Sequence, residues 1–478
     1  MNGLEEVVDP GTFARVYDDL ESSDPLHFPG YRALLERARS RGADESVVAG
    51  TATIRGHPVV AAGFDFGFLG GSLGEVAGER LARALMDAAE RSLPFVLRTT
   101  TGGARMQEGM RALIQMPKMV AARRVLADAH QPFIAVLADP TTGGVLASLG
   151  ALADVTIAQE GSTLGFAGPR VVEAATGRAL PEGSHTAAAA FARGAVDALL
   201  PHSEIAAYVA RVLGIVSDSR PEPVPIETDD IGRTSDAPRD GWEVVTRARS
   251  EQRPRAPALL REMADDAIEL RGDRGGGDDP ALVAAVVRIA GRRAAALALD
   301  RAHAPGPGAF RKARRCLEVA ARLRLPVVTL VDTPGADPSA ASEAGGIAWE
   351  IARTFDAFLA LPVPVVAVVT GEGGSGGALA LATADRLVAY EGSIFSVIRP
   401  EAAAAILWRD PERAPDAARV LQLGARALLE LGIADRLAPE PLSAPSLRAL
   451  VAQELDGLGC GPSGEALAEA RRARWRAL

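Results

Sequence analysis

Two glycine pairs are the residues whose type and spacing best suit chemistry. Gly143–Gly144 and Gly376–Gly377 each follow a β-branched run and open an alanine-rich segment, GGVLASLGALAD and GGALALATAD. Main-chain N–H groups without side chains approach a ligand closely, and the amino end of a helix adds about half a positive charge. Such a turn favours an oxyanion. For a thioester this is the enolate left when the α-carbon loses a proton, and each donor contributes roughly 3–4 kcal/mol.

Two other interpretations of these glycines stay open at this point. The glycines could serve only to let strand and helix pack closely, or GEGGSGGA could hold a phosphate. Close packing alone would be a sufficient explanation for one isolated glycine pair. It explains two equivalent turns less well, because each is accompanied by a further glycine turn, at Gly102–Gly103 or at Gly335. A phosphate loop of the G-x-x-x-x-G-K-[ST] type is not in the sequence.

Conventional catalytic side chains do not stand out. His303 lies in the Pro/Gly segment AHAPGPGAF and is interpreted as a solvated loop histidine. The sequence shows no nucleophile elbow, no His/Cys cluster for a metal and no paired carboxylates in helical register. This pattern indicates chemistry performed by main-chain dipoles together with a cofactor.

The elements around the glycine turns occur twice, at an offset of 231 to 233 residues. The recurring segments are 93–97 with 325–331, 131–137 with 363–369, and 153–162 with 384–393. The β-branched runs after a proline predict buried parallel strands, and 78–92 and 311–323 have the apolar spacing of helices. Strands alternating with helices predict two α/β domains in tandem.

Length and composition agree with two domains. We expect an N-terminal domain at 1–216, a linker at 217–242 that is rich in Pro, Asp and Ser, and a C-terminal domain at 243–478. Cys316 and Cys460 are the two cysteines, so a reducing cytoplasm is favoured over a disulfide framework. No long uncharged apolar run predicts a membrane span, and the net charge of −9 disfavours nucleic acid as a partner.

Longer strings resemble a known enzyme family. Residues 59–202, with TGGARMQEGM, GGVLASLGALAD and LGFAGPRVVE, resemble the β subunit of bacterial acetyl-CoA carboxylase carboxyltransferase. Residues 283–442, with VVTLVDTPGADP and VTGEGGSGGALALATAD, resemble its α subunit. The resemblance implies a fused β/α carboxyltransferase made of tandem crotonase-like (ClpP/crotonase) domains, with the acyl-CoA half first and the biotin half second.

The resemblance also implies roles for individual residues. Gly143 and Gly144 would form the oxyanion hole for the acyl-CoA thioester, and Gly376 and Gly377 would donate to the ureido oxygen of biotin. The family match places Gly102, Gly103, Arg105, Gly168 and Arg170 on the acyl-CoA side, and Gly335, Gly373, Gly374 and Ser375 on the biotin side. Both arginines are expected to have structural or electrostatic roles.

In the family reaction, biotin delivers its carboxyl group and its ureido nitrogen takes the α-proton of the acyl-CoA, by default acetyl-CoA. The chain has no A-M-K-M biotinylation site, so a separate biotin carboxyl carrier protein and a biotin carboxylase are expected partners. The family site forms between the N-terminal half of one chain and the C-terminal half of another, which implies a homodimer or a higher oligomer.

The sequence departs from the family pattern in several places. Residues 1–50 contain no cysteine, so the family's zinc ribbon and its zinc are not expected, and the segments 301–309 and 339–347 are altered. Two rival functions remain: a biotin-independent decarboxylase or lyase of malonyl-type thioesters, and a non-catalytic assembly subunit.

Overall fold

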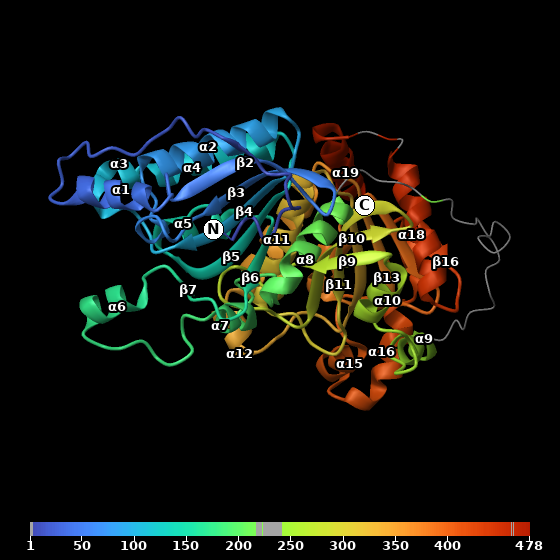
Figure 1. Cartoon of the computed structure of the whole chain (residues 1–478). Helices are drawn as coiled ribbons and strands as arrows, with labels where there is room; N and C mark the ends of the chain where they lie inside the picture. Colours follow the sequence, from blue (N-terminus) through green and yellow to red (C-terminus); the bar gives the residue numbers. More distant parts are fainter. Residues whose placement is uncertain (1–2, 217–221, 223–240, 460, 462) are drawn as a thin grey trace. The chain divides into compact units, whose positions relative to one another are not determined.

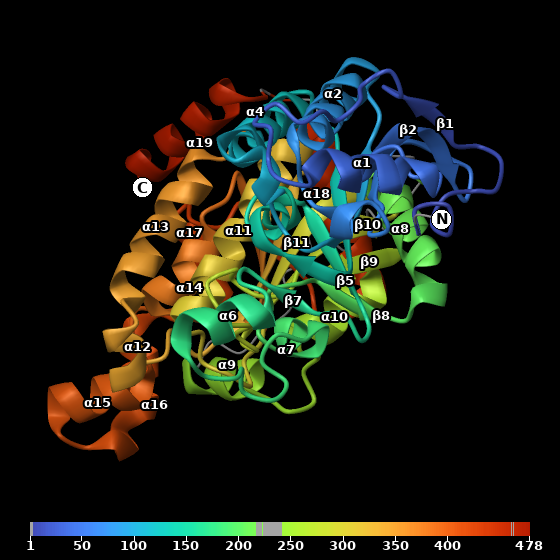
Figure 2. The ribbon, with the colours of Figure 1, turned by 60° about the vertical axis from the view of Figure 1, so that its left-hand side comes forward.

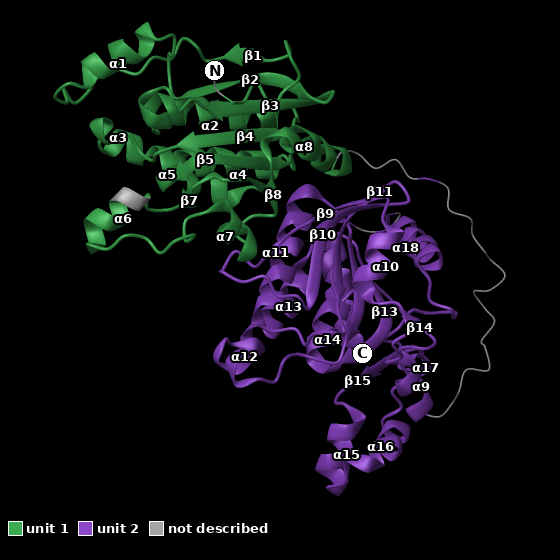
Figure 3. Ribbon diagram, turned by 60° about the horizontal axis from the view of Figure 1, so that its bottom comes forward, with its two compact units in different colours: residues 1–216 green, residues 217–478 purple. Residues whose placement is uncertain are grey.

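The computed structural model describes residues 3–216, 222, 241–459, 461 and 463–478. The chain divides into two compact units, Met1–Val216 and Ser217–Leu478 (Figure 3). The expected linker at 217–242 lies outside the described residues, apart from Glu222 and the first two residues of a helix that begins at Gly241.

A mixed sheet forms the centre of the first unit (Figure 1). Its described strands are β1 (Ala14–Val16), β2 (Val47–Ile54), β3 (His57–Phe64), β4 (Phe95–Thr101), β5 (Phe133–Thr142), β6 (Val155–Gln159), β7 (Leu164–Gly165) and β8 (Ala198–Leu200). They lie in the order β1–β2–β3–β4–β5–β6–β8, and β7 pairs with β5 beyond the end of β6. From β3 onward the pairs are parallel, as expected for strands connected by helices.

Helices cover both faces of this sheet. They are α1 (Tyr31–Ser40), α2 (Glu75–Glu90), α3 (Met110–Leu113), α4 (Gln115–Asp128), α5 (Gly143–Leu146), α6 (Pro169–Thr176), α7 (Ala187–Ala192) and α8 (His202–Val216). Helices α2 and α4 pack side by side on one face, where Leu81, Leu85 and Leu126 share a core with Phe95 and Phe133. Helix α8 packs against β2, β3 and β6. Because both faces are covered, β4 is buried along its whole length.

The second unit repeats this plan. Its described strands are β9 (Asp266–Glu269), β10 (Leu282–Ile289), β11 (Arg292–Leu299), β12 (Val327–Thr333), β13 (Val365–Gly374), β14 (Arg386–Tyr390), β15 (Ile394–Ser396) and β16 (Arg436–Ala438). The order is β16–β14–β13–β12–β11–β10–β9, with β15 paired to β13. The sheet is parallel from β11 to β16.

The helices of the second unit are α9 (Gly241–Ala248), α10 (Ala256–Met263), α11 (Pro307–Leu323), α12 (Ala340–Ala344), α13 (Ile347–Ala360), α14 (Ser375–Ala382), α15 (Pro400–Trp408), α16 (Ala414–Leu421), α17 (Ala425–Glu430), α18 (Ala444–Gly459) and α19 (Glu465–Ala477). One face of the sheet packs on α10 and α18, and α11 lies against β10 and β11. Figure 2 shows α15 and α16 extending away from the sheet of this unit.

Strand register demonstrates the duplication residue by residue. Thr101 pairs with Thr141 between β4 and β5, and Thr333 pairs with Gly373 between β12 and β13, so equivalent residues are 232 positions apart. The same irregularity interrupts both ladders just before these pairs. The predicted helices at 78–92 and 311–323 correspond to α2 and α11, which begin three and four residues earlier than expected.

Candidate functional site

In the first unit, two glycine turns meet at the carboxyl ends of neighbouring strands. Strand β4 leads into Gly102–Gly103, and β5 leads into α5 at Gly143. Gly103 and Gly143 have φ values of 115° and 68°, a region that favours glycine. A Cβ atom on Gly143 would lie 2.8 Å from the Cα of Gly103. The two turns can therefore approach this closely only because residue 143 is a glycine.

The main-chain N–H groups of this turn have different partners. Gly103 donates to the side-chain oxygen of Thr101 at 3.1 Å, and Gly143 donates to the carbonyl of Phe166 at 2.8 Å. Because α5 begins at Gly143, the next N–H groups, those of Gly144 and Val145, have no acceptor within the helix. Gly143 therefore shapes the turn, and Gly144 is the glycine of this pair whose N–H is suited to a ligand.

The second unit has the same pair of turns with one substitution. Gly335 has a φ of 122° and donates to the side-chain oxygen of Thr333 at 3.3 Å, as Gly103 does to Thr101. Ser375 has a φ of 58° and opens α14 at the position where Gly143 opens α5. Thr101 and Thr333 were missed by the sequence reasoning, although the threonine two residues before each glycine recurs at the same offset.

The register corrects one equivalence expected from sequence. Gly143–Gly144 and Gly376–Gly377 were aligned with each other, but at an offset of 232 the partners of Gly143 and Gly144 are Ser375 and Gly376. Glycine spacing misled the alignment because Ser375 tolerates the left-handed conformation that Gly143 adopts. Gly376–Gly377 therefore lies one residue further along the second turn than Gly143–Gly144 lies along the first.

The glycines of the second unit's turn have different surroundings. A Cβ on Gly374 would lie 2.2 Å from the carbonyl oxygen of Pro334, and one on Gly373 would lie 2.3 Å from the ring of Phe395. A Cβ on Gly377 would come within 3.0 Å of the main-chain nitrogen of Ala336. Gly376 faces open space, with no described atom within 4 Å of an added Cβ. Three of these glycines are thus needed for packing, and Gly376 borders a free volume.

Arg105 lies in the core of the first unit, where its guanidinium pairs with buried carboxylates. Its side chain is fully buried and contacts the carboxylates of Glu45 at 2.5 Å and Glu108 at 3.1 Å. It also donates to the side chains of Ser22 at 2.8 Å and Ser46 at 2.9 Å. The placement of Arg105 among the acyl-CoA-binding residues is therefore corrected to the structural role that was also expected for it.

Burial and charge pairing determine the electrostatics around Arg105. Burial alone would raise the pKa of Glu45, but the adjacent Arg105 guanidinium lowers it below its usual value. Tyr31, at the start of α1, donates to Glu108 at 2.5 Å, and burial raises the pKa of its phenol. The segment from Ser22 to Ser46 is therefore joined to the turn after β4 by charged and neutral hydrogen bonds.

Gly168 and Arg170 lie apart from the glycine turns in sequence. Gly168 precedes α6 with an ordinary φ of −63°, and an added Cβ there would meet no described atom within 4 Å. Arg170 belongs to α6, but its side chain lies outside the described residues. The structure thus adds no contact for either prediction.

A buried acid lies close to the glycine turn of the second unit. Asp332, in β12, is fully buried and contacts the Arg301 guanidinium at 2.5 Å. It also accepts the main-chain N–H of Glu372 in β13 at 3.1 Å. Burial raises the pKa of Asp332 to about 6, and the opposing effect of Arg301 offsets this only in part. Asp332 thereby connects the end of β12 to the end of β13 through a hydrogen bond.

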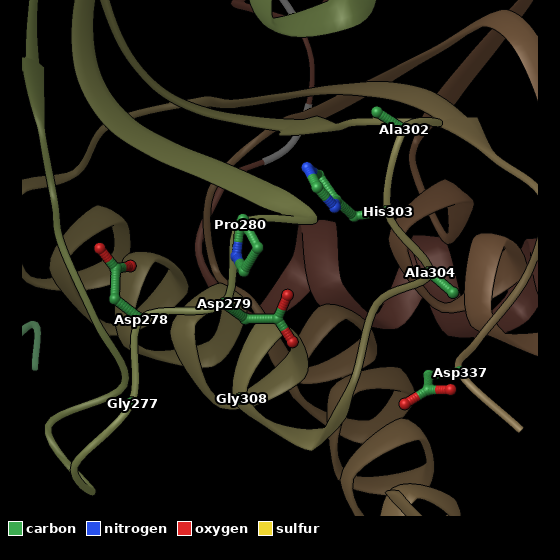
Figure 4. A pocket seen from close by; sticks show the side chains of 9 residues that line it. All are labelled: Gly277, Asp278, Asp279, Pro280, Ala302, His303, Ala304, Gly308 and Asp337. Carbon is green, nitrogen blue, oxygen red and sulfur yellow. The ribbon is translucent and has the colours of Figure 1, made fainter. Parts of the chain in front are cut away.

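A cavity of about 590 Å³ lies beside the loop that follows Gly335 (Figure 4). It is lined by Gly277, Asp278, Asp279, Pro280, Ala302, His303, Ala304, Gly308 and Asp337. The two altered segments, 301–309 and 339–347, meet next to it. Asp337 donates its N–H to the carbonyl of Pro305 at 3.0 Å, and a Cβ on Gly345 would lie 3.0 Å from the Pro307 ring. The altered segments therefore pack against each other.

Within the described ranges, no group of three or more His, Cys, Asp or Glu side chains is arranged to hold a metal ion. Among the described helices, none is both long and apolar enough to cross a bilayer.

Comparison with known proteins places this geometry in a family. The family model described as acetyl co-enzyme A carboxylase carboxyltransferase-like matches residues 236–456. The acetyl-coenzyme A carboxylase carboxyl transferase subunits beta/alpha of Salinispora tropica are 43% identical over 465 residues, covering 92% of this chain and 82% of the relative. The chain belongs to the acetyl-CoA carboxylase carboxyltransferase family.

Other matches to this carboxyltransferase agree. A probable biotin-dependent acyl-coenzyme A carboxylase beta3 subunit of Mycobacterium bovis is 36% identical, with 91% of this chain and 88% of that protein covered. The transcarboxylase 12S crystal structure, a hexamer with methylmalonyl-coenzyme A bound, matches with a TM-score of 0.76 at 23% identity, covering 96% and 89% of the two chains. The tandem crotonase-like α/β fold predicted from sequence is confirmed, as is the family resemblance.

Proposed function

We propose that this carboxyltransferase moves a carboxyl group between biotin and the α-carbon of an acyl-CoA, acetyl-CoA by default, through an enolate. The observation that carries the proposal is the pair of equivalent glycine turns, one in each unit, in a chain of this family. The two turns provide two sets of main-chain donors, and the reaction has two oxygens that gain negative charge.

The first unit is proposed to hold the acyl-CoA. The N–H of Gly144, at the start of α5, donates to the thioester oxygen and stabilises the enolate. Gly103 and Gly143 lie in contact beneath this position, and Gly102, Gly168 and Arg170 are assigned to the acyl-CoA side by the family match alone.

The second unit is proposed to bind the ureido group of biotin. The open space at Gly376 and the eight-residue helix α14 that starts beside it suit a neutral ring whose oxygen accepts main-chain N–H groups. Gly335, Gly373, Gly374 and Ser375 form the walls of that turn. Biotin, when bound, supplies the carboxyl group and the nitrogen base for the α-proton.

Further components follow from this function. The domain assignment proposed is 1–216 for the acyl-CoA side and 243–478 for the biotin side, with 217–242 as linker. We propose a separate biotin carboxyl carrier protein, a biotin carboxylase, a cytoplasmic location and no bound zinc. The exposed side chains Ile406, Leu407 and Val420, 70%, 63% and 72% exposed, support self-association into a homodimer or higher oligomer.

The test is consumption of malonyl-CoA by the pure protein, with and without free biotin. Carboxyl transfer predicts that acetyl-CoA forms only when biotin is present and that its rate saturates with biotin. A rate that does not depend on biotin would instead indicate the decarboxylase, and no turnover of malonyl-CoA or of longer malonyl-type thioesters would indicate an assembly subunit.

A further inference from the structure

Glu372 is a buried carboxylate close to the biotin-side turn. It lies in β13, three residues before Ser375, and its side chain is only 4% exposed. Arg249, just after α9, contacts it with two parallel hydrogen bonds, Nε to Oε2 at 2.9 Å and Nη2 to Oε1 at 2.6 Å. A bidentate pair of this kind fixes the plane and position of both groups.

The same guanidinium holds a second segment next to the turn. Its Nη1 donates to Glu401 Oε1 at 2.6 Å, and Glu401 lies in the first turn of α15. Helix α15 follows β15, whose residues Phe395 and Ser396 pair with Gly373 and Gly374. Arg249 therefore joins two segments that flank the glycine turn, the end of β13 and the start of α15.

The duplication offers an internal comparison. At the offset of 232, Glu372 corresponds to Pro140 and Asp332 corresponds to Thr100, which donates its hydroxyl to the carbonyl of Phe64 at 2.8 Å. The first unit thus builds the same turn without a buried carboxylate at either position. The Arg249–Glu372 pair is therefore a feature of the second unit that the shared fold does not require.

We propose that Arg249 is a positioning residue for biotin, acting through Glu372 and Glu401 to set the main-chain donors from Gly373 to Gly377. The inference rests on the proposed function, in which this turn receives the ureido group. It differs from a general contribution to folding, because it predicts an effect on one substrate and not on the other. Displacements of about 1 Å at such donors change rates by up to about a hundredfold.

The test uses the full chain and malonyl-CoA consumption with free biotin. For Arg249→Met we expect KM for biotin to rise, and kcat/KM for biotin to fall at least about tenfold, while KM for malonyl-CoA stays within about twofold. KM does not depend on the amount of active protein, so partial unfolding does not mimic this result. Arg249→Lys keeps the charge and loses the bidentate geometry. It should fold like the wild type and still raise KM for biotin several-fold.

Arg292→Met is the matched control. Arg292 also forms a bidentate pair, with Asp456 at 2.7 and 2.6 Å, but it lies at the first residue of β11, at the opposite end of that strand from the turn. We expect its KM for both substrates to match the wild type. Unchanged biotin KM in both Arg249 variants, or equal shifts for both substrates, would overturn the inference. Failure of the proposed function would appear separately, as wild-type turnover that is absent or independent of biotin.

Discussion

Two glycines that look alike in sequence have different physical roles. Gly143 has a φ of 68° and touches Gly103, so its missing side chain is required by the fold. Gly376 lies at the second residue of α14, with no described atom within 4 Å of an added Cβ. A side chain at Gly376 would extend into the volume that we assign to biotin.

Gly376→Ala should separate stability from activity. Alanine is favoured over glycine in a helix by about 1 kcal/mol, so the melting temperature should hold or rise. Biotin-dependent malonyl-CoA consumption should nevertheless fall strongly, because the methyl group occupies the ligand volume. Thermal unfolding and steady-state kinetics on the same preparation check both parts.

Gly143→Ala is the contrasting variant. Its Cβ would lie 2.8 Å from Gly103 at an unfavourable φ, so we expect the melting temperature and the activity to fall together, with a strain of about 1–3 kcal/mol. A Gly376→Ala protein with normal biotin kinetics would remove this glycine from the site.

Asp332 should make the stability of the second unit depend on pH. Burial raises its pKa in the folded state from the usual 3.8 to about 6, so the folded protein binds this proton more tightly than the unfolded chain. Stability should therefore fall as pH rises from about 4 to about 6, by about 3 kcal/mol for a shift of about two pKa units.

The measurement is the free energy of unfolding of the wild type and of Asp332→Asn between pH 4 and 7. All other titrating groups are shared, so the difference between the two proteins isolates Asp332. We expect the wild type to lose stability relative to the variant across this window and then to level off. A difference that stays constant from pH 4 to 7 would contradict a raised pKa.

Hydrogen bonds and ion pairs connect the segment before β2 to the turn after β4. Arg105 is buried between Glu45 and Glu108, and Tyr31 at the start of α1 reaches the same cluster. Removal of the arginine leaves two buried carboxylates without their shared cation. Residues 1–50 contain no cysteine, and polar contacts from Ser22 and Ser46 to Arg105 hold this segment in place.

Arg105→Met should destabilise the first unit by about 3–5 kcal/mol. Hydrogen exchange of the β4 amides localises the effect to this unit, because the two units need not unfold together. The control is Arg91→Met, which breaks an exposed ion pair with Asp87 and should leave the stability of the first unit close to that of the wild type. An Arg105→Met protein of normal stability with a raised KM for malonyl-CoA would instead show direct contact with the ligand.

Local patterns in the sequence predicted the sheet, its duplication and the position of both turns. β-branched runs, helical spacing and paired glycines act over a few residues, and these features recur at a nearly constant offset. The one-residue error at Ser375 arose because a left-handed serine has no sequence signature. The ion pairs of Arg105 and Arg249 join residues 60 and 123 positions apart, and only the folded chain shows such partners.

At the scale of the whole molecule, the chain is a fused carboxyltransferase with one glycine turn pair in each unit. In the proposed function, biotin comes from another protein, and the exposed apolar side chains of α15 and α16 pack on a second copy of the chain. We expect the purified protein to sediment as a homodimer or larger, and Ile406→Asp, at a side chain 70% exposed on α15, to shift it toward the monomer. An unchanged sedimentation coefficient would show that α15 lies outside the interface.

In the proposed reaction, main-chain amides at two equivalent turns hold the two oxygens that gain negative charge. A crystal structure with malonyl-CoA and biotin bound would locate both oxygens. We predict that the thioester oxygen lies about 2.9 Å from the main-chain nitrogen of Gly144. The ureido oxygen should lie at a similar distance from main-chain nitrogens of the turn at Gly376. Ligands bound away from both turns, or held only by side chains, would contradict this role of the main-chain amides.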